Sequence, residues 1–173
     1  MGITIHYGFR MRSKDSVIRL LKKTKALASK LGMKLIQEQD TMLVLHPHPK
    51  CESINLDFRQ WKEVKAVKEW DYCKECMQDF SKLLNDTDYV CASFTKTQFA
   101  GFETHVTVAE FLRRIAASCS LSYVSDEADY YETGDMELAA KNFDANTEMI
   151  QKFTTYLKEH FGAENVYSSI DQA

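Results

Sequence analysis

The sequence predicts an α+β fold in which helices pack on one face of a mainly antiparallel sheet. Short strand-like segments follow one another closely in the first half, and amphipathic helical patterns alternate with strands in the second half. A hydrophobic content of 45% with only two prolines in 173 residues indicates a folded chain with a real core. We expect one domain over residues 1–162, a loose tail over 163–173, and the order β-α-β-β-β-α-β-α-β-(β)-α.

The first half begins with residues 3–9, which alternate as a strand does. A helix follows, capped by Ser13 and ended by Gly32, with apolar residues at the spacing of one helical face. Three strands come next, over 33–37, 42–46 and 53–58. Their short connections favour antiparallel neighbours.

The second half is predicted with one ambiguous segment, residues 59–72, where apolar residues at every third position fit a helix only roughly. The other elements are a helix over 73–84, a strand over 89–95, a helix over 105–119, a strand over 121–125, a further short strand over 129–133 and a helix over 135–161. The inward face of the last helix is predicted to carry Phe143, Thr147, Ile150, Phe153, Leu157 and Phe161.

The composition limits the cellular compartments in which we expect this chain. No run of about 18 apolar residues that could span a bilayer is present, and the alternating N-terminus does not resemble a signal peptide. Five cysteines, an odd number, fit a reducing compartment better than a disulfide framework. We therefore predict a cytoplasmic protein with no membrane contact.

Charge is distributed unevenly along the chain. Residues 1–35 hold nine Lys or Arg and one Asp, a net charge of +8, whereas residues 125–137 hold six acids and no base. The basic run lacks the interleaved aromatic residues and the motifs of a nucleic-acid-binding protein, so nucleic acid is disfavoured as a partner. Solvated helix faces account for both segments, and self-association between the basic N-terminal helix and the acidic segment is the alternative.

Two polar tracts, 93–105 and 126–135, contain the candidate ligand site. Each is built around one glycine, Gly101 or Gly134, beside the start of a predicted helix, where unpaired N–H groups favour polar or anionic ligands. We predict a small-ligand pocket between loops 96–101 and 130–135. Its predicted ligand-binding residues are Lys96, Thr97, Gln98 and Thr133, together with His105 and Glu132.

His105 and Glu132 also support a second hypothesis, a hydrolase or lyase in which they divide the acid and base roles. His105 falls in the first turn of its helix and on the apolar stripe, which suits a neutral imidazole. The alternatives remain a half-buried histidine satisfied by a backbone group, an ordinary strand-to-helix turn at Gly101, and a solvated acidic loop that caps the last helix.

Two further motifs could bind metal or carry out redox chemistry. Cys73 and Cys76 form a CxxC pair, but they lie on the apolar stripe of a predicted helix and lack a second ligand pair. His46 and His48 flank a proline, where Cys51 and Glu52 could join them, although a bend between strands also explains the pattern. We therefore assign no metal site and no cofactor.

The tracts TKTQFAG with the helix containing His105, DEADYYETGD at 126–135, GITIHY and CES-INLDF resemble an uncharacterised prokaryotic protein family. That family pairs a KTQ-aromatic-AG…H tract with an acidic DEG-x-(Y/W)-x-ETGD tract. The chain departs from it at Ala128-Asp129, where glycine is expected, and at His46-Pro47-His48, and residues 59–88 match no part of it. The resemblance implies that residues 96–105 and 126–135 form one shared feature, without naming an activity, cofactor or substrate.

Overall fold

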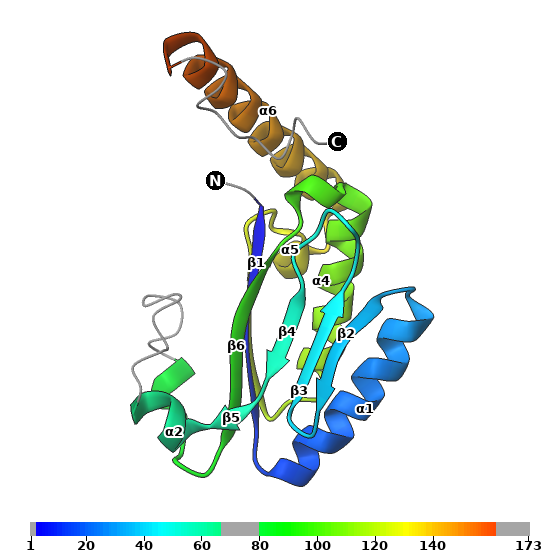
Figure 1. Ribbon diagram of the computed structural model, residues 1–173, viewed down its shortest axis with the longest axis vertical. Coiled ribbons are helices and arrows are strands. Elements are labelled where there is room, and N and C mark those ends of the chain that lie inside the picture. The colour runs from blue at the N-terminus through cyan, green and yellow to red at the C-terminus, as the bar shows by residue number, and fades with distance from the viewer. Residues whose placement is uncertain (1–2, 67–79, 162–173) are drawn as a thin grey trace.

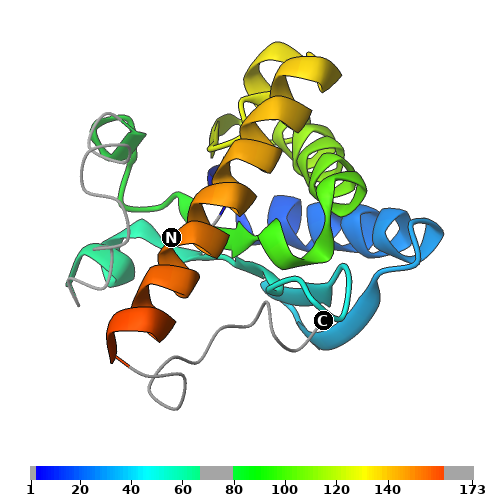
Figure 2. The same ribbon diagram turned by 90° about the horizontal axis from the view of Figure 1, so that it is seen from above.

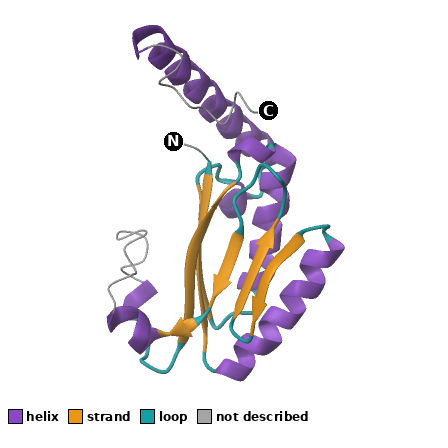
Figure 3. Cartoon of the chain, in the orientation of Figure 1, coloured by secondary structure: helices purple, strands orange, loops and turns teal. Residues whose placement is uncertain are grey.

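The computed structural model describes residues 3–66 and 80–161 and contains two antiparallel sheets (Figures 1 and 3). One sheet has the strand order β5-β6-β1-β7 and the other β2-β3-β4. The strands are β1 (Thr4–Met11), β2 (Lys34–Gln39), β3 (Met42–His46), β4 (Ile54–Asp57), β5 (Arg59–Gln60), β6 (Tyr89–Lys96) and β7 (Leu121–Asp126). The predicted α+β class with mainly antiparallel pairing is confirmed.

Helices α1 (Lys14–Lys30) and α4 (Phe102–Ala116) lie on the same side of the strands (Figure 2). Between helices and strands lies one large apolar cluster, whose fully buried side chains include Tyr7, Phe9, Leu43, Leu56, Phe58, Phe111 and Leu112. Burial of this apolar surface is the main force that holds the sheets against the helices.

The first helix begins and ends as its sequence predicts. The Ser13 hydroxyl accepts a hydrogen bond from the backbone N–H of Ser16, and the Ser16 hydroxyl accepts one from the Ser13 N–H, so the pair forms a reciprocal cap. At the other end Gly32 has φ of 71°, a left-handed conformation that glycine adopts without steric cost.

Replacing the cap should therefore weaken this helix measurably. We expect Ser13→Ala to lower the free energy of unfolding by about 1 kcal/mol, because the first-turn N–H of Ser16 loses its acceptor. Urea denaturation followed by circular dichroism measures the change. Ser29→Ala, at an exposed site near the end of α1, serves as the matched control, and equal losses in the two variants would contradict the prediction.

Several element boundaries differ from the predictions. Residues predicted as a strand over 129–133 form the short helix α5 (Tyr130–Thr133), because Asp129 and Gly134 bracket it with left-handed φ values of 63° and 68°. The ambiguous segment begins with β5 and the helix α2 (Trp61–Ala66). Cys73, Cys76 and the predicted tail lie outside the described residues.

The last helix, α6 (Met136–Phe161), has its buried side chains near its start, among the residues whose burial the structure describes. Ala139 and Phe143 are buried, whereas Phe153, predicted to face inward, is 47% exposed. Figure 1 shows the reason: α6 extends away from the sheets, so its outer half has no core to face. Among the described residues, none of the helices is long and apolar enough to cross a membrane.

Candidate functional site

The two polar tracts meet at a buried histidine. Gly101, with φ of 88°, ends the 3₁₀ turn Gln98–Ala100 and starts α4, which places His105 in the first turn of that helix. The Thr97 hydroxyl lies 2.8 Å from His105 Nδ1, and His105 Nε2 lies 3.1 Å from Asp126 Oδ2. The side chains of His105 and Asp126 have no solvent exposure.

Asp126 is the centre of this network. One carboxylate oxygen accepts from His105 Nε2 and from the Tyr131 N–H, and the other accepts from the Ala128 N–H. Burial by itself would raise the pKa of this carboxyl. The hydrogen bond and charge of His105, with the two backbone donors, outweigh burial and leave the Asp126 pKa below its ordinary value. Asp126 therefore accepts the Nε2 proton of His105, and the Thr97 hydroxyl, which can both donate and accept, is the hydrogen-bond partner of Nδ1.

Glu132 and Thr133 hold the acidic turn together. Glu132 Oε1 accepts from the Asp126 N–H at 2.9 Å, so Asp126 is the bridge between His105 and Glu132. The Thr133 hydroxyl donates to the Asp129 carbonyl and accepts from the Asp135 N–H. Asp135 in turn accepts from the first-turn N–H groups of α6, which gives it the capping role that the sequence allowed.

Asp129 starts the short helix α5 in a left-handed conformation. Its φ is 63°, which Asp tolerates better than most residues other than glycine. The Asn142 side chain donates to the Asp129 carboxylate at 3.0 Å, and this contact ties the acidic turn to α6.

Gln98 and Lys96 differ in burial and in the groups that they contact. Gln98 is 6% exposed and accepts from the Ile3 N–H through Oε1, while its Nε2 has no hydrogen-bond partner within residues 3–66 and 80–161. Lys96 is exposed, and its Nζ lies 3.9 Å from Glu52 Oε1, on the loop between β3 and β4. Of the predicted ligand residues, Thr97, Gln98 and His105 are thus buried, whereas Lys96, Glu132 and Thr133 are exposed.

A cavity of about 590 Å³ lies beside that end of β6, between β4 and β6. None of the six predicted site residues lines it. Its lining residues are His46, Cys51, Glu52, Ser53, Asn55, Ala92, Ser93 and Phe94. We call this cavity the β4–β6 cleft.

The cleft lies where the two sheets separate. β5 pairs with the start of β6, and the Glu52 N–H bonds to the Lys96 carbonyl at the other end. Between these points, side-chain hydroxyl groups take the place of backbone hydrogen bonds between β4 and β6. The Tyr7 hydroxyl donates to the Asn55 carbonyl and accepts from the Asn55 N–H, and the Thr95 hydroxyl donates to the Ser53 carbonyl. The strand edges are therefore joined by hydroxyl groups rather than by direct pairing.

His46 is held in one orientation at this cleft. Its Nε2 lies 2.8 Å from the Cys51 carbonyl, which only accepts, so Nε2 carries the proton and Nδ1 of the neutral ring is an acceptor. Within residues 3–66 and 80–161, Nδ1 has no hydrogen-bond partner. The Cys51 thiol donates to the Lys96 carbonyl, and burial raises its pKa to about 12, so this thiol is a weak nucleophile.

In the described part of the chain, no group of three or more His, Cys, Asp or Glu side chains is placed to hold an ion. His46 bonds to the Cys51 carbonyl, and His48 Nδ1 accepts from the Lys50 N–H. Each imidazole thus has a hydrogen-bond partner in the loop between β3 and β4.

The sequence indicated only part of the cleft. His46, Cys51 and Glu52 stand out as potential ligands, whereas Ser53, Asn55 and Ser93 read as ordinary polar positions of strands. The alternation of these polar residues with buried Ile54 and Leu56 was the available signal, but every half-exposed strand carries it.

No protein-family model, curated protein or solved structure matches this chain.

Proposed function

We propose that this chain binds a small polar ligand in the β4–β6 cleft. The observation that carries the proposal is His46, a cleft-lining side chain whose Nε2–H is fixed by the Cys51 carbonyl and whose Nδ1 has no partner recorded among the described residues. A histidine oriented in this way is a ready acceptor for a ligand N–H or O–H group.

The rest of the lining supports a ligand that donates hydrogen bonds. The Glu52 carboxylate accepts only, and the Ser53, Ser93 and Asn55 side chains both donate and accept. Phe94 and Ala92 add an apolar wall. A small amine, amide or polyol with a short apolar part fits this combination better than a strongly anionic molecule.

Lys96 contributes to this proposal from outside the cleft. Its backbone N–H donates to Glu52 Oε2, and its ammonium group lies 3.9 Å from Glu52 Oε1, so Lys96 orients that carboxylate. Lys96 is therefore a positioning residue for Glu52, in place of the direct ligand contact that the sequence suggested.

Ligand-observed NMR tests the proposal with a set of small amines, amides, polyols and carboxylates as probes. We expect donor-bearing probes to bind, and His46→Ala to weaken them by about tenfold, because one hydrogen bond to the ligand is lost. Asn55→Trp should block the cleft, whereas Gln37→Trp, at an exposed site on β2, is the matched control. Binding that survives Asn55→Trp, or no binding to the unmodified chain, would refute the proposal.

The acid–base hypothesis for His105 and Glu132 stays a prediction. Both groups reach Asp126, but the His105 side chain is fully buried, and a substrate would reach it only after the surrounding turn opened. The cleft needs no such opening, and this difference favours ligand binding there.

A further inference from the structure

The outer half of α6 carries an apolar stripe that faces solvent. Met149, Phe153 and Tyr156 are 54%, 47% and 51% exposed. They recur at spacings of four and three residues, so their side chains lie on one side of the helix. Ile150 and Leu157 widen the stripe, and both are half-buried.

This spacing is that of a two-helix seam. Phe153 and Tyr156 occupy alternating positions of a seven-residue repeat, with Met149 seven residues before Tyr156. Monomeric proteins seldom leave several large apolar side chains in a row on an exposed helix. The stripe thus has the pattern of a helix that packs against another helix.

Charged residues beside the stripe indicate which helix that is. Lys152 and Glu159 are seven residues apart and so take the same place in the repeat, next to the seam. When two copies of α6 pack antiparallel, this position of the repeat on one copy faces the same position on the other. Lys152 of each copy then lies opposite Glu159 of the other copy, so the two-fold symmetry gives two such ion pairs.

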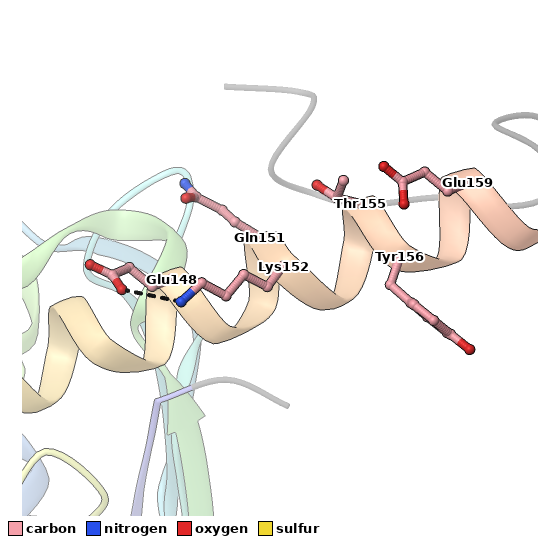
Figure 4. A pocket seen from close by; sticks show the side chains of 6 residues that line it. All are labelled: Glu148, Gln151, Lys152, Thr155, Tyr156 and Glu159. Atoms are coloured by element: carbon pink, nitrogen blue, oxygen red, sulfur yellow. Dashed lines mark ion pairs between the residues drawn. The ribbon is translucent and has the colours of Figure 1, made fainter.

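Figure 4 shows this part of the helix. Glu148, Gln151, Lys152, Thr155, Tyr156 and Glu159 line an open hollow of about 360 Å³. Lys152 pairs with Glu148 at 3.8 Å within the same helix, and Tyr156 points away from Thr155. Lys152 therefore has one carboxylate partner along its own helix, and the three N–H donors of its ammonium group allow a second.

We propose that two copies of this chain associate through α6, antiparallel, with Phe153 of each copy packed against Tyr156 of the other. Lys152 and Glu159 form the two flanking ion pairs. The basic helix α1 is a weaker candidate for self-association, because all its large apolar side chains are buried or half-buried and it presents no apolar stripe to solvent.

Sedimentation velocity over a wide concentration range tests the proposal on the full chain. We expect a monomer–dimer equilibrium, and Phe153→Glu should weaken it by at least about tenfold, because a seam side chain is replaced by a charge. Gln151→Glu is the matched control, because it adds the same charge at the position of the repeat farthest from Phe153 and Tyr156 and should leave the equilibrium unchanged.

A charge exchange tests the antiparallel pairing itself. Lys152→Glu should weaken association by about fivefold, since it brings like charges together at both flanks. Adding Glu159→Lys should restore it, and circular dichroism checks that α6 stays helical throughout. A chain that sediments as a monomer at every concentration leaves this stripe to another kind of partner and overturns the proposal. An exchange that fails to restore association overturns the antiparallel pairing.

Discussion

Replacing Asp126 by alanine should lower the free energy of unfolding by about 3–5 kcal/mol, because it leaves His105 and two backbone N–H groups buried without their acceptor. Chemical denaturation measures the loss. Asp144→Ala, at an exposed site on α6, is the matched control and should change stability little.

The same carboxylate gives a pH dependence with a definite sign. Because the folded-state pKa of Asp126 is lowered, its contribution is present above the unfolded pKa of about 3.9 and is lost as the pH falls through the lower folded value. The stability difference between the unmodified chain and Asp126→Ala should therefore be constant from neutral pH down to about 5 and shrink below about 4. A difference that stayed constant into strong acid would contradict this account.

Thr97→Val offers a milder test if Asp126→Ala fails to fold. It removes the hydroxyl beside His105 Nδ1 and should cost about 0.5–1.5 kcal/mol, the usual range for one hydrogen bond. An unchanged free energy of unfolding would show that the Thr97 contact contributes nothing to the network.

Tyr7 should be the second site of large effect, because its ring fills the core and its hydroxyl joins the two sheets. We expect Tyr7→Ala to cost about 3–5 kcal/mol through loss of a buried aromatic ring. Tyr7→Phe isolates the hydroxyl and should cost about 1–3 kcal/mol, because the Asn55 N–H and carbonyl lose their partner.

Hydrogen exchange can separate these two roles of Tyr7. In Tyr7→Phe the Asn55 amide proton should exchange faster, while amides of α1 keep their relative protection. Tyr131→Phe removes a hydroxyl outside both sheets and serves as the control. Unchanged exchange at Asn55 would show that Tyr7 does not bridge the sheets in solution.

Local signals predicted most of the elements correctly. Ser13, the apolar spacing from Val17 to Ala28 and Gly32 define α1 without help from the rest of the chain. Residues 129–133 were predicted as a strand, because tyrosines favour strands and the left-handed Asp129 that starts the turn has no sequence signature of its own. Phe153 was predicted inward because periodicity marks an apolar face but not what covers it.

The candidate site, like the fold, was predicted only in part. Polar tracts around Gly101 and Gly134 were visible in the sequence, and the structure brings them together through His105 and Asp126. Periodicity could not show that Thr97 and Gln98 are buried, or that Lys96 faces Glu52 instead of the acidic turn. The ligand site between the two loops therefore remains a prediction.

The sequence by itself determined the α+β class, the caps of the first helix and the residue types that gather in the two polar tracts. These features depend on contacts between residues close in the chain, which spacing and composition report directly. Only the tertiary structure decided that β4 and β6 separate around the Tyr7 hydroxyl, that His46 lies at the resulting cleft, and that α6 leaves the core. Those outcomes depend on the register between distant strands and on which face finds a partner, and local patterns carry no information about either.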